Sequence, residues 1–335
     1  MSTLADVFKD IEKISGKGCL MEGVEVKDVE RVPLRMINVN RMLYGGIPKG
    51  RMIELAGPES SGKTSTSLMI AADYQSQDDR PVFFVDAEGT YDPRWAAKLG
   101  VDNSKGRFIK WAPENVTAEE VFEKILQVAD TDEVGLIILD SIPALVPQNE
   151  DAKNMTQLTM GGISHPLTVF SRKLQKILLK NDTVIFIGLN QVRDNMSQYG
   201  PSTTTTGGHG WKHMCSIRLE TAGVNIDATG NYVPESSDKT AGVKINVNVK
   251  KNKTAPKNRK LGYYVLNFET GFNQVVDIVD AGLTFGVVEQ RGSSFSYTDT
   301  ETGEVVSGLG RAKFMEKLTP ELLEKIKREV LAHDD

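Results

Sequence analysis

Hydrophobic positions follow two patterns along the chain, continuous apolar runs and runs with helical periodicity. From residue 51, short and continuous apolar runs are typical of buried strands, and they cover 51–56, 82–86, 135–139 and 183–189. Segments with helical spacing separate these runs, and they cover 64–77, 93–99, 117–130 and 164–180. Apolar strands that alternate with helices are typical of a parallel sheet covered on both faces. The pattern predicts an α/β fold with a doubly wound, mostly parallel sheet.

Both flanks of this alternation have a different pattern. Residues 2–15 carry apolar side chains at helical spacing, which predicts an amphipathic helix. Its apolar stripe must pack on the body of this chain or on a neighbouring copy. Strand-like runs return later, at 214–219, 243–250 and 261–268, and two further helices are expected at about 274–283 and 319–332. We therefore expect an N-terminal helix and connector over 1–35, a core over 36–270 and a small α/β domain over 271–335.

The stretch from Asn190 to Trp211 fits neither the strand pattern nor the helix pattern. It is polar, rich in Gly and Thr, and shows no periodicity. A long segment without regular structure inside a compact domain usually carries function. We expect a functional loop here.

Composition is that of an ordinary globular protein. The chain has 335 residues, of which 39% are hydrophobic and 25% charged, and no apolar run approaches the length of a membrane span. The N-terminus lacks the pattern of a signal peptide, and Cys19 and Cys215 have neither disulfide-framework nor zinc spacing. We expect a cytoplasmic protein with two unpaired thiols. Because the formal net charge is −5, any surface that binds nucleic acid must be local.

The strongest chemical signal lies between the first apolar run and the helix after it. It reads G-x-x-x-x-G-K-T, the phosphate-binding P-loop, and comprises Gly57, Pro58, Glu59, Ser60, Ser61, Gly62, Lys63 and Thr64. The glycines allow a tight turn that brings backbone N–H groups toward an anion. Lys63 can reach the β- and γ-phosphates, and Thr64 offers a hydroxyl to Mg²⁺. The N-terminus of the following helix adds partial positive charge.

Polar residues end three of the predicted strands. In an open α/β sheet the ligand lies beyond the carboxyl ends of the strands. Asp140 follows four apolar residues, so we expect it to help hold Mg²⁺. Glu88 is a candidate base for an attacking water, and Gln191 could contact the γ-phosphate or that water. Solvated strand-end carboxylates are the alternative for Glu88 and Asp140.

Residues 239–268 form the most electropositive segment, because they contain no Asp or Glu. Their basic residues include Lys244, Lys250, Lys251, Lys253, Lys257, Arg259 and Lys260. Such a segment fits binding to the phosphates of nucleic acid or of ATP. A solvated basic loop is the alternative, and it is the commoner meaning of a charge run.

Taken in order, these motifs resemble the bacterial RecA recombinase family. The order and spacing match over nearly the whole chain, including the N-terminal helix and the tail from Gly271. The matching runs are GPESSGKT, Phe84-Val85-Asp86-Ala87-Glu88 with Asp92-Pro93, Leu139-Asp140-Ser141, Asn190-Gln191-Val192-Arg193, Thr204-Thr205-Thr206-Gly207-Gly208 and Lys251-Asn252-Lys253. The resemblance implies a P-loop core of RecA type with an N-terminal helix and a small C-terminal α/β domain.

The resemblance also implies a function. It indicates a DNA-dependent ATPase that forms a helical filament on single-stranded DNA and catalyses homologous pairing and strand exchange. ATP and Mg²⁺ would be its cofactors. Its partners would be single-stranded DNA, duplex DNA during exchange, further copies of the chain, and a single-strand-binding protein or loading mediator. No membrane partner would be expected. Lys63 and Thr64 would bind phosphate and Mg²⁺, Glu88 would activate water, and Gln191 would sense the γ-phosphate.

The rest of the nucleotide site comes from the resemblance as well. Asp92 belongs to the matched motif, and Trp95 stands where the family has a tyrosine that stacks on adenine. The aromatic face is kept, so stacking should survive; a core aromatic is the alternative reading of Trp95. Lys251 and Lys253 match the pair that reaches the γ-phosphate of the neighbouring subunit. The nucleotide would then lie between protomers.

Two loops would line the DNA, loop one at about Gln148–Gly162 and loop two at about Val192–Gly208. Met160 and Tyr199 are candidates to lie against or between bases, with loop packing as the alternative for Met160. The other candidate DNA contacts are Arg193, Thr204, Thr205, Thr206, Gly207 and Gly208.

The chain also departs from the family pattern. Loop one differs over Asn149–Thr159, loop two is one residue shorter, and His213 replaces a phenylalanine of the filament interface. Basic residues of the family's secondary DNA site are replaced near Glu220-Thr221-Ala222 and at Asn246 and Asn248, so that site is in doubt or is rebuilt from other lysines and arginines. This divergence suits a virus-encoded member acting in a host cytoplasm.

Two rival functions use the same core fold. A ring helicase would need a helicase-specific addition, which we do not recognise in the sequence. A DNA-binding protein that binds ATP without hydrolysing it would not need Glu88 and Asp140, which are both intact.

Overall fold

The structure is a computed structural model that describes residues 2–16, 19–20, 28–151, 162–194, 203–228, 230–256 and 258–333. The chain divides into two compact units, Met1–Glu30 and Arg31–Asp335. The first unit carries helix α1 (Leu4–Ser15). Thr3 begins this helix with a capping box, because its hydroxyl accepts the backbone N–H of Asp6 while the Asp6 carboxylate accepts the N–H of Thr3. None of the residues of α1 is buried.

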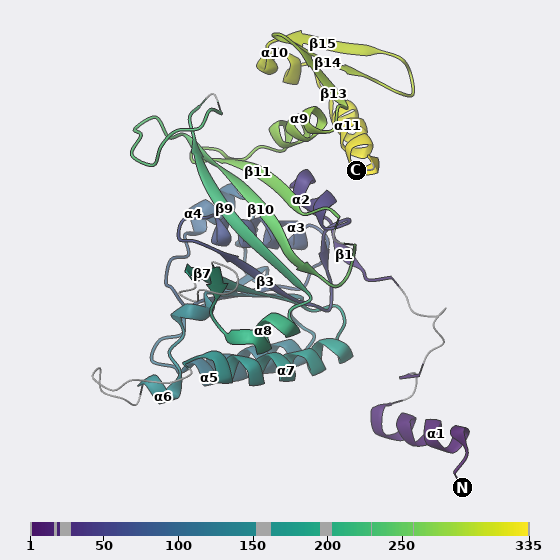
Figure 1. The fold of residues 1–335 in the computed structure, drawn as a ribbon, viewed down its shortest axis with the longest axis vertical. Coiled ribbons are helices and arrows are strands. Elements are labelled where there is room, and N and C mark those ends of the chain that lie inside the picture. The colour runs from purple at the N-terminus through teal and green to yellow at the C-terminus, as the bar shows by residue number, and fades with distance from the viewer. Residues whose placement is uncertain are drawn as a thin grey trace. The chain divides into compact units, whose positions relative to one another are not determined.

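The second unit is built on a sheet of ten strands (Figure 1). Neighbouring strands from β9 to β5 run parallel, whereas the β9–β10–β11–β12 edge is antiparallel. In sheet order the strands are β12 (Gly271–Phe272), β11 (Leu261–Asn267), β10 (Gly242–Asn252), β9 (Ile217–Ile226), β3 (Met52–Gly57), β7 (Ile185–Asp194), β6 (Leu136–Asp140), β4 (Val82–Asp86) and β5 (Phe108–Trp111). The tenth strand, β8 (Thr203–Thr205), pairs antiparallel with the end of β7.

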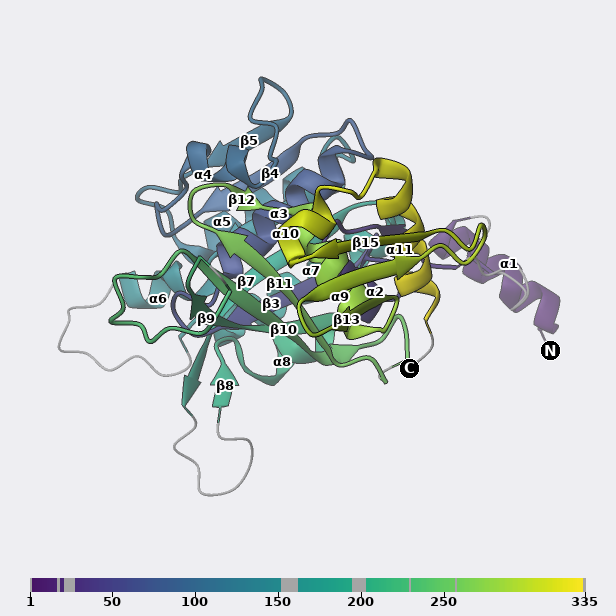
Figure 2. The same ribbon diagram turned by 90° about the horizontal axis from the view of Figure 1, so that it is seen from above.

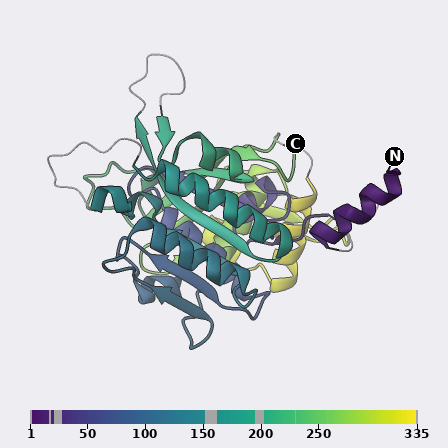
Figure 3. The same ribbon diagram turned by 90° about the horizontal axis from the view of Figure 1, so that it is seen from below.

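Helices cover both faces of this sheet, and each face has its own hydrophobic core. Ile137 and Ile138 are consecutive in β6 but belong to different cores, since successive strand residues point to opposite faces. Figure 3 shows two long helices, α5 and α7, side by side in front of the sheet. Phe122 of α5 stacks on Phe170 of α7, with ring centroids 4.5 Å apart. One core includes α2 (Ile37–Met42), α3 (Lys63–Gln75) and α4 (Pro93–Lys98), and the other includes α5 (Ala118–Asp130), α7 (Ser164–Lys180) and α8 (Gly208–Met214).

The C-terminal segment has a third core around an antiparallel sheet. Ile37 of α2 packs into this core, and its backbone N–H donates to Asp277 at 2.7 Å. The elements of this segment are α9 (Gln274–Thr284), β13 (Val288–Arg291), β14 (Ser294–Thr298), β15 (Val305–Leu309), α10 (Arg311–Met315) and α11 (Pro320–Ala332). The remaining elements are β1 (Arg31–Val32), β2 (Ile47–Pro48), the 3₁₀ turn η2 (Ile142–Ala144) and α6 (Gln148–Asp151).

The predicted α/β fold with a doubly wound, mostly parallel sheet is confirmed. The expectation of a structureless stretch from Asn190 to Trp211 is wrong in part, because β7, β8 and α8 all enter it. Their regularity comes from cross-strand pairing and a buried Trp211, which leave no periodic trace in the sequence. The domain boundaries at residues 35 and 270 stay predictions. No helix in the described ranges is long and apolar enough to cross a membrane.

Candidate functional site

The P-loop connects β3 to α3 and depends on its glycines. Gly62 has a φ of 85°, a left-handed conformation that side chains disfavour. A Cβ atom there would also lie 2.2 Å from the side chain of Ile245. At Gly57 a Cβ atom would lie 2.3 Å from the Ser61 hydroxyl. The loop can therefore close tightly over the end of the sheet only with glycine at both positions.

Lys63 lies over this loop. Its ammonium donates to the carbonyls of Pro58 at 2.6 Å and Gly57 at 3.2 Å. Burial lowers the pKa of Lys63, while Glu88 and Asp140 act in the opposite direction. A cation held by neutral carbonyls beside two carboxylates can accept an anionic ligand without breaking an ion pair.

The ends of β4 and β6 bring two predicted site carboxylates to the same edge. Asp140 is 2% exposed and accepts the Thr64 hydroxyl at 2.7 Å. Burial raises the pKa of Asp140 to about 6, although the hydrogen bond from Thr64 lowers it. Glu88 accepts the hydroxyl of Ser141, the residue after Asp140. The backbone N–H of Glu88 also donates to the Asp140 carbonyl at 3.3 Å, which fixes the two strand ends together.

A pocket of about 710 Å³ joins these groups. Its polar side consists of loop residues 59–65 with Glu88, Asp140 and Gln191. Its apolar side combines Trp95 with residues from the distant strands β10 and β11 and the turn after them, namely Val243, Ile245, Leu266 and Phe268. The volume suits a nucleotide-sized ligand. Apart from Trp95, sequence reasoning missed the apolar side, because nothing in the strand pattern shows which residues the fold brings to the P-loop.

Trp95 lines the pocket, and it also makes a hydrogen bond that the sequence did not predict. Its indole N–H donates to the hydroxyl of Ser65 at 3.1 Å, so the ring is held against the start of α3. Asp92, another predicted site residue, caps α4 by accepting the N–H of Arg94 at 2.8 Å. Asp92 is not among the residues of the described chain that line the pocket. Its predicted role at the nucleotide stays a prediction.

Gln191 stands at the pocket edge where β7 leaves the parallel sheet. Beyond it, β7 pairs with β8, so that Val192 lies opposite Thr205 and Arg193 opposite Thr204. We call this hairpin, residues 192–194 with 203–205, the loop-two stem (Figure 2). The pocket and the start of loop two are thus adjacent along one strand.

Those predicted DNA contacts that the structure describes lie on this stem or directly after it. Arg193 is exposed on β7, and Thr204 is exposed on β8. Thr206 leads to Gly207 and Gly208, whose φ angles of 101° and 68° start α8. Met160 and Tyr199 lie outside the described residues.

Lys251 and Lys253 lie at the opposite end of α8 from the loop-two stem. The Lys251 ammonium donates to the carbonyls of Lys212 at 2.7 Å and His213 at 2.9 Å, and Lys253 donates to His213 at 3.2 Å. Cations at a helix C-terminus are favoured by the helix dipole. Neither lysine lines the pocket of its own chain.

Two other basic residues of β10 have partners. The Lys244 ammonium stacks over the Tyr263 ring at 3.9 Å, and Lys250 pairs with Glu220 at 3.2 Å. Lys257 lies outside the described residues. The electropositive segment is therefore partly organised by contacts within the chain.

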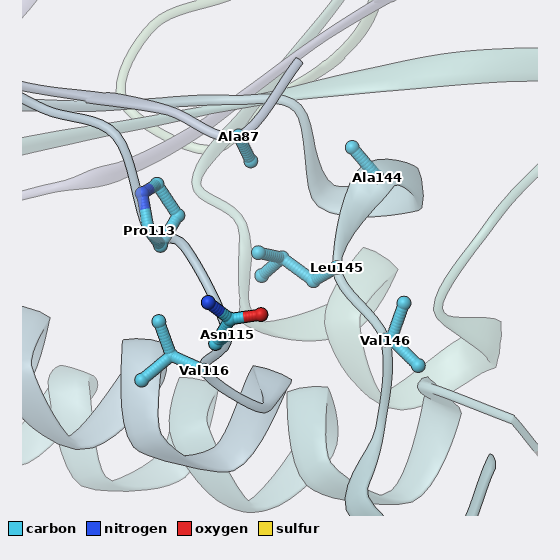
Figure 4. Close-up of a pocket in the computed structure, with 7 residues that line it drawn as sticks. All are labelled: Ala87, Pro113, Asn115, Val116, Ala144, Leu145 and Val146. Atoms are coloured by element: carbon cyan, nitrogen blue, oxygen red, sulfur yellow. The ribbon is translucent and has the colours of Figure 1, made fainter. Parts of the chain in front are cut away.

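A second hollow of about 310 Å³ lies beside Ala87, the residue after β4, between η2 and the start of α5 (Figure 4). Ala87, Asn115 and Leu145 are among the residues that line it. None of its described lining side chains is titratable. It offers no group for proton transfer or for holding a phosphate.

Comparisons with known proteins place the chain in a family. Residues 2–273 match the model of the RecA N-terminal domain. The chain is 36% identical over 339 residues to Protein RecA of Thermus aquaticus, which covers 99% of this chain and 94% of that protein. Protein RecA of Bacteroides thetaiotaomicron is 33% identical over 330 residues, and this match covers 97% of this chain and 95% of that protein. The crystal structure of the RadB recombinase shares the fold, with a TM-score of 0.50 and 17% identity over 70% of this chain and 94% of that chain. The chain therefore belongs to the RecA family.

Proposed function

We propose that this protein is a DNA-dependent ATPase that assembles as a helical filament on single-stranded DNA and catalyses homologous pairing and strand exchange. The observation that carries the proposal is the adjacency of the pocket to the loop-two stem. Gln191 lines the pocket, and the next residue begins the stem. Nucleotide binding and DNA binding then meet on one strand.

The pocket residues fit ATP with Mg²⁺. The P-loop supplies backbone N–H groups at the N-terminus of α3, and Lys63 supplies a cation for the terminal phosphates. Thr64 and Asp140 offer hard oxygen ligands already in contact, 2.7 Å apart. When bound, Mg²⁺ neutralises negative charge that develops on the phosphates. The apolar side with Trp95 suits the face of a purine.

Hydrolysis needs a base beyond the γ-phosphate, and Glu88 is our candidate. Its hydrogen bond from Ser141 fixes the carboxylate at the strand end, where it can take a proton from an attacking water. Gln191 orients that water or contacts the γ-phosphate. Asp92 completes the predicted nucleotide contacts.

Filament assembly would place each nucleotide between two protomers. Lys251 and Lys253 are proposed to contact the γ-phosphate of the neighbouring copy, which agrees with their position outside the pocket of their own chain. The exposed apolar residues of α1, Leu4 at 68% and Ile14 at 86% exposed, would be covered by a neighbouring protomer. ATP then acts as an assembly switch.

DNA binding is assigned to loops one and two. Arg193 and the segment Thr204–Gly208 would contact phosphates, and Met160 and Tyr199 would contact bases. Duplex DNA would enter during exchange, with a single-strand-binding protein or a loading mediator as further partners. The cytoplasm, or a host cytoplasm for a virus-encoded protein, is the expected compartment.

The test is phosphate release with and without single-stranded DNA, over a range of salt concentrations. We expect strong stimulation by DNA that fades with salt, since phosphate contacts release counterions. Lys63→Ala should abolish turnover, whereas Lys124→Ala, which changes an exposed lysine of α5, should not. Full turnover in Lys63→Ala would contradict the site assignment, and turnover that ignores DNA would contradict the recombinase proposal.

Electron microscopy tests the assembly separately. With a non-hydrolysable ATP analogue and single-stranded DNA, we expect continuous helical filaments. Closed rings would favour a helicase instead.

A further inference from the structure

A buried carboxylate on β3 has three hydrogen-bond donors that the proposed ATP chemistry does not use. Glu54 is 0% exposed and lies in β3, three residues before Gly57, the first residue of the P-loop. It accepts the Asn190 amide at 2.8 Å, the Trp211 indole N–H at 2.9 Å and the Arg218 guanidinium. These donors come from β7, α8 and β9. Glu54 thus joins elements on both sides of β3 to the helix after loop two.

Asn190 connects this carboxylate to the pocket and to loop two at once. Its amide nitrogen donates to the Thr206 carbonyl at 2.8 Å as well as to Glu54. Its amide oxygen accepts the backbone N–H of Gln191 at 2.9 Å. Since Asn190 is fully buried, this one side chain fixes the backbone of the pocket residue Gln191 relative to Thr206, the residue that directly follows the loop-two stem. We call Thr206 and the stem residues before it the base of loop two.

Each of three consecutive threonines at the end of loop two is held by a different side chain near Glu54. The Lys212 ammonium donates to the Thr204 hydroxyl at 2.7 Å. Arg218, which also donates to Glu54, lies 3.4 Å from the Thr205 hydroxyl. Asn190 holds Thr206 through its carbonyl. The segment proposed to contact DNA phosphates is therefore held by Asn190 and Arg218, which both donate to Glu54, and by Lys212, which follows the Glu54 donor Trp211.

A purely structural role would explain the burial but not the connections. A buried carboxylate needs its donors, because an unsatisfied charge in a low-dielectric interior is strongly destabilising. Packing alone, however, does not require that a donor to Glu54 also hydrogen-bonds to the backbone of Gln191 and of Thr206, as Asn190 does. Coupling between sites is carried by such contiguous polar networks when both sites bias the same arrangement.

We propose that Glu54 and Trp211 are positioning residues that transmit nucleotide occupancy from the P-loop strand to loop two. The proposal rests on the proposed function, because it needs ATP and DNA to bind at these two places. Phosphate binding fixes the end of β3 at Gly57, Glu54 fixes Asn190 and Trp211, and these fix the base of loop two. Neither Glu54 nor Trp211 lines the pocket, and both are fully buried.

The test measures the factor by which a non-hydrolysable ATP analogue tightens binding of single-stranded DNA, which is a coupling between the two sites. Trp211→Phe keeps the aromatic packing and removes the N–H that donates to Glu54. We expect the coupling factor to fall by about fivefold or more, with affinity for the nucleotide alone unchanged. Trp111→Phe is the matched control, since Trp111 stacks on Phe83 and makes no contact with Glu54 in the described structure. The control should keep the full coupling factor.

Glu54→Gln provides a second variant of nearly the same shape. Its amide oxygen can still accept the N–H groups of Asn190 and Trp211, but its NH₂ group cannot accept from Arg218. If both substitutions act through the same network around residue 54, their effects on the coupling factor will be less than additive in the double variant. Thermal unfolding of each variant shows whether it folds cooperatively. A full coupling factor in Trp211→Phe, or failure of both variants to fold, would overturn the inference and leave the proposed function standing. Absence of any coupling in the unsubstituted protein would overturn both.

Discussion

Two buried aspartates, Asp140 and Asp277, lie in regions that serve different purposes. Burial raises the pKa of Asp140 to about 6 and that of Asp277 to about 7. Asp140 opens onto a pocket, and nearby Lys63 lowers its pKa. Asp277 is buried at the contact of α9 with α2, where it accepts the N–H of Ile37 and has Asp280 as its charged neighbour.

The comparison teaches that a raised pKa does not by itself mark an active site. Perturbed groups are functional candidates when they also line a cleft and face a specific charge. Asp140 meets both conditions. Asp277 lines neither of the two hollows described above, and its charged neighbour, Asp280, has the same sign rather than the opposite one. Its carboxyl instead joins the C-terminal segment to the core through Ile37. Substitutions should separate the two regions, with turnover changing in one and stability in the other.

The largest effect is expected for Asp140→Asn. DNA-stimulated turnover should fall by about 10³-fold, because support of the metal is worth several kcal/mol in the transition state. The free energy of unfolding should not fall, since a buried charge is removed and the amide can still accept the Thr64 hydroxyl. Phosphate release and thermal unfolding measure the two effects. A stability loss with full turnover would reverse our assignment of Asp140.

Glu88→Gln should reduce turnover by about 100-fold or more, as expected for loss of a general base. Nucleotide affinity should change little, because the amide keeps a hydrogen bond from Ser141. The measurement is single-turnover hydrolysis together with binding of a fluorescent ATP analogue. Glu114→Gln, at an exposed position, is the control. Equal turnover in both variants would remove Glu88 from the mechanism.

Asp277→Asn should leave turnover unchanged and alter the pH dependence of stability. The pKa of Asp277 is raised from 3.8 to about 7 in the folded protein. Its contribution to stability is therefore full below about pH 4 and is lost as the pH rises through 7, because the unfolded chain releases the proton first. The asparagine variant should be more stable than the unsubstituted protein at pH 8, by roughly 2–4 kcal/mol, and this difference should shrink toward pH 4.

Denaturant unfolding at several pH values measures this difference. Asp238→Asn, which changes an exposed carboxylate, should show no such pH dependence. If the two substitutions behave alike, Asp277 is not the group that we describe.

The smallest effect is expected for Trp95→Phe. The aromatic face remains but the hydrogen bond to Ser65 is lost, so KM for ATP should rise by about two- to fivefold with kcat unchanged. Ser65→Ala removes the same hydrogen bond and should give a similar rise. Steady-state kinetics of both variants and of the double variant measure this. Independent, additive effects would show that the hydrogen bond does not orient Trp95.

The sequence by itself determined the elements that depend on local pattern. The apolar runs predicted β3, β4, β6 and β7, and the G-x-x-x-x-G-K-T motif with the strand-end residues Asp140, Glu88 and Gln191 predicted one side of the pocket. The strand-end residues line one pocket because the carboxyl ends of parallel strands meet at one edge of a sheet. Their roles at a nucleotide stay predictions.

Only the tertiary structure decided the contacts between distant segments. It placed Val243 and Phe268 opposite the P-loop, bound Trp95 to Ser65, and gathered Asn190, Trp211 and Arg218 on Glu54. It also formed β8 and α8 within the stretch from Asn190 onward, where the sequence shows no periodicity. Their stability comes from pairing and burial across long sequence separations, and these depend on how the strands are ordered in the sheet rather than on neighbouring residues.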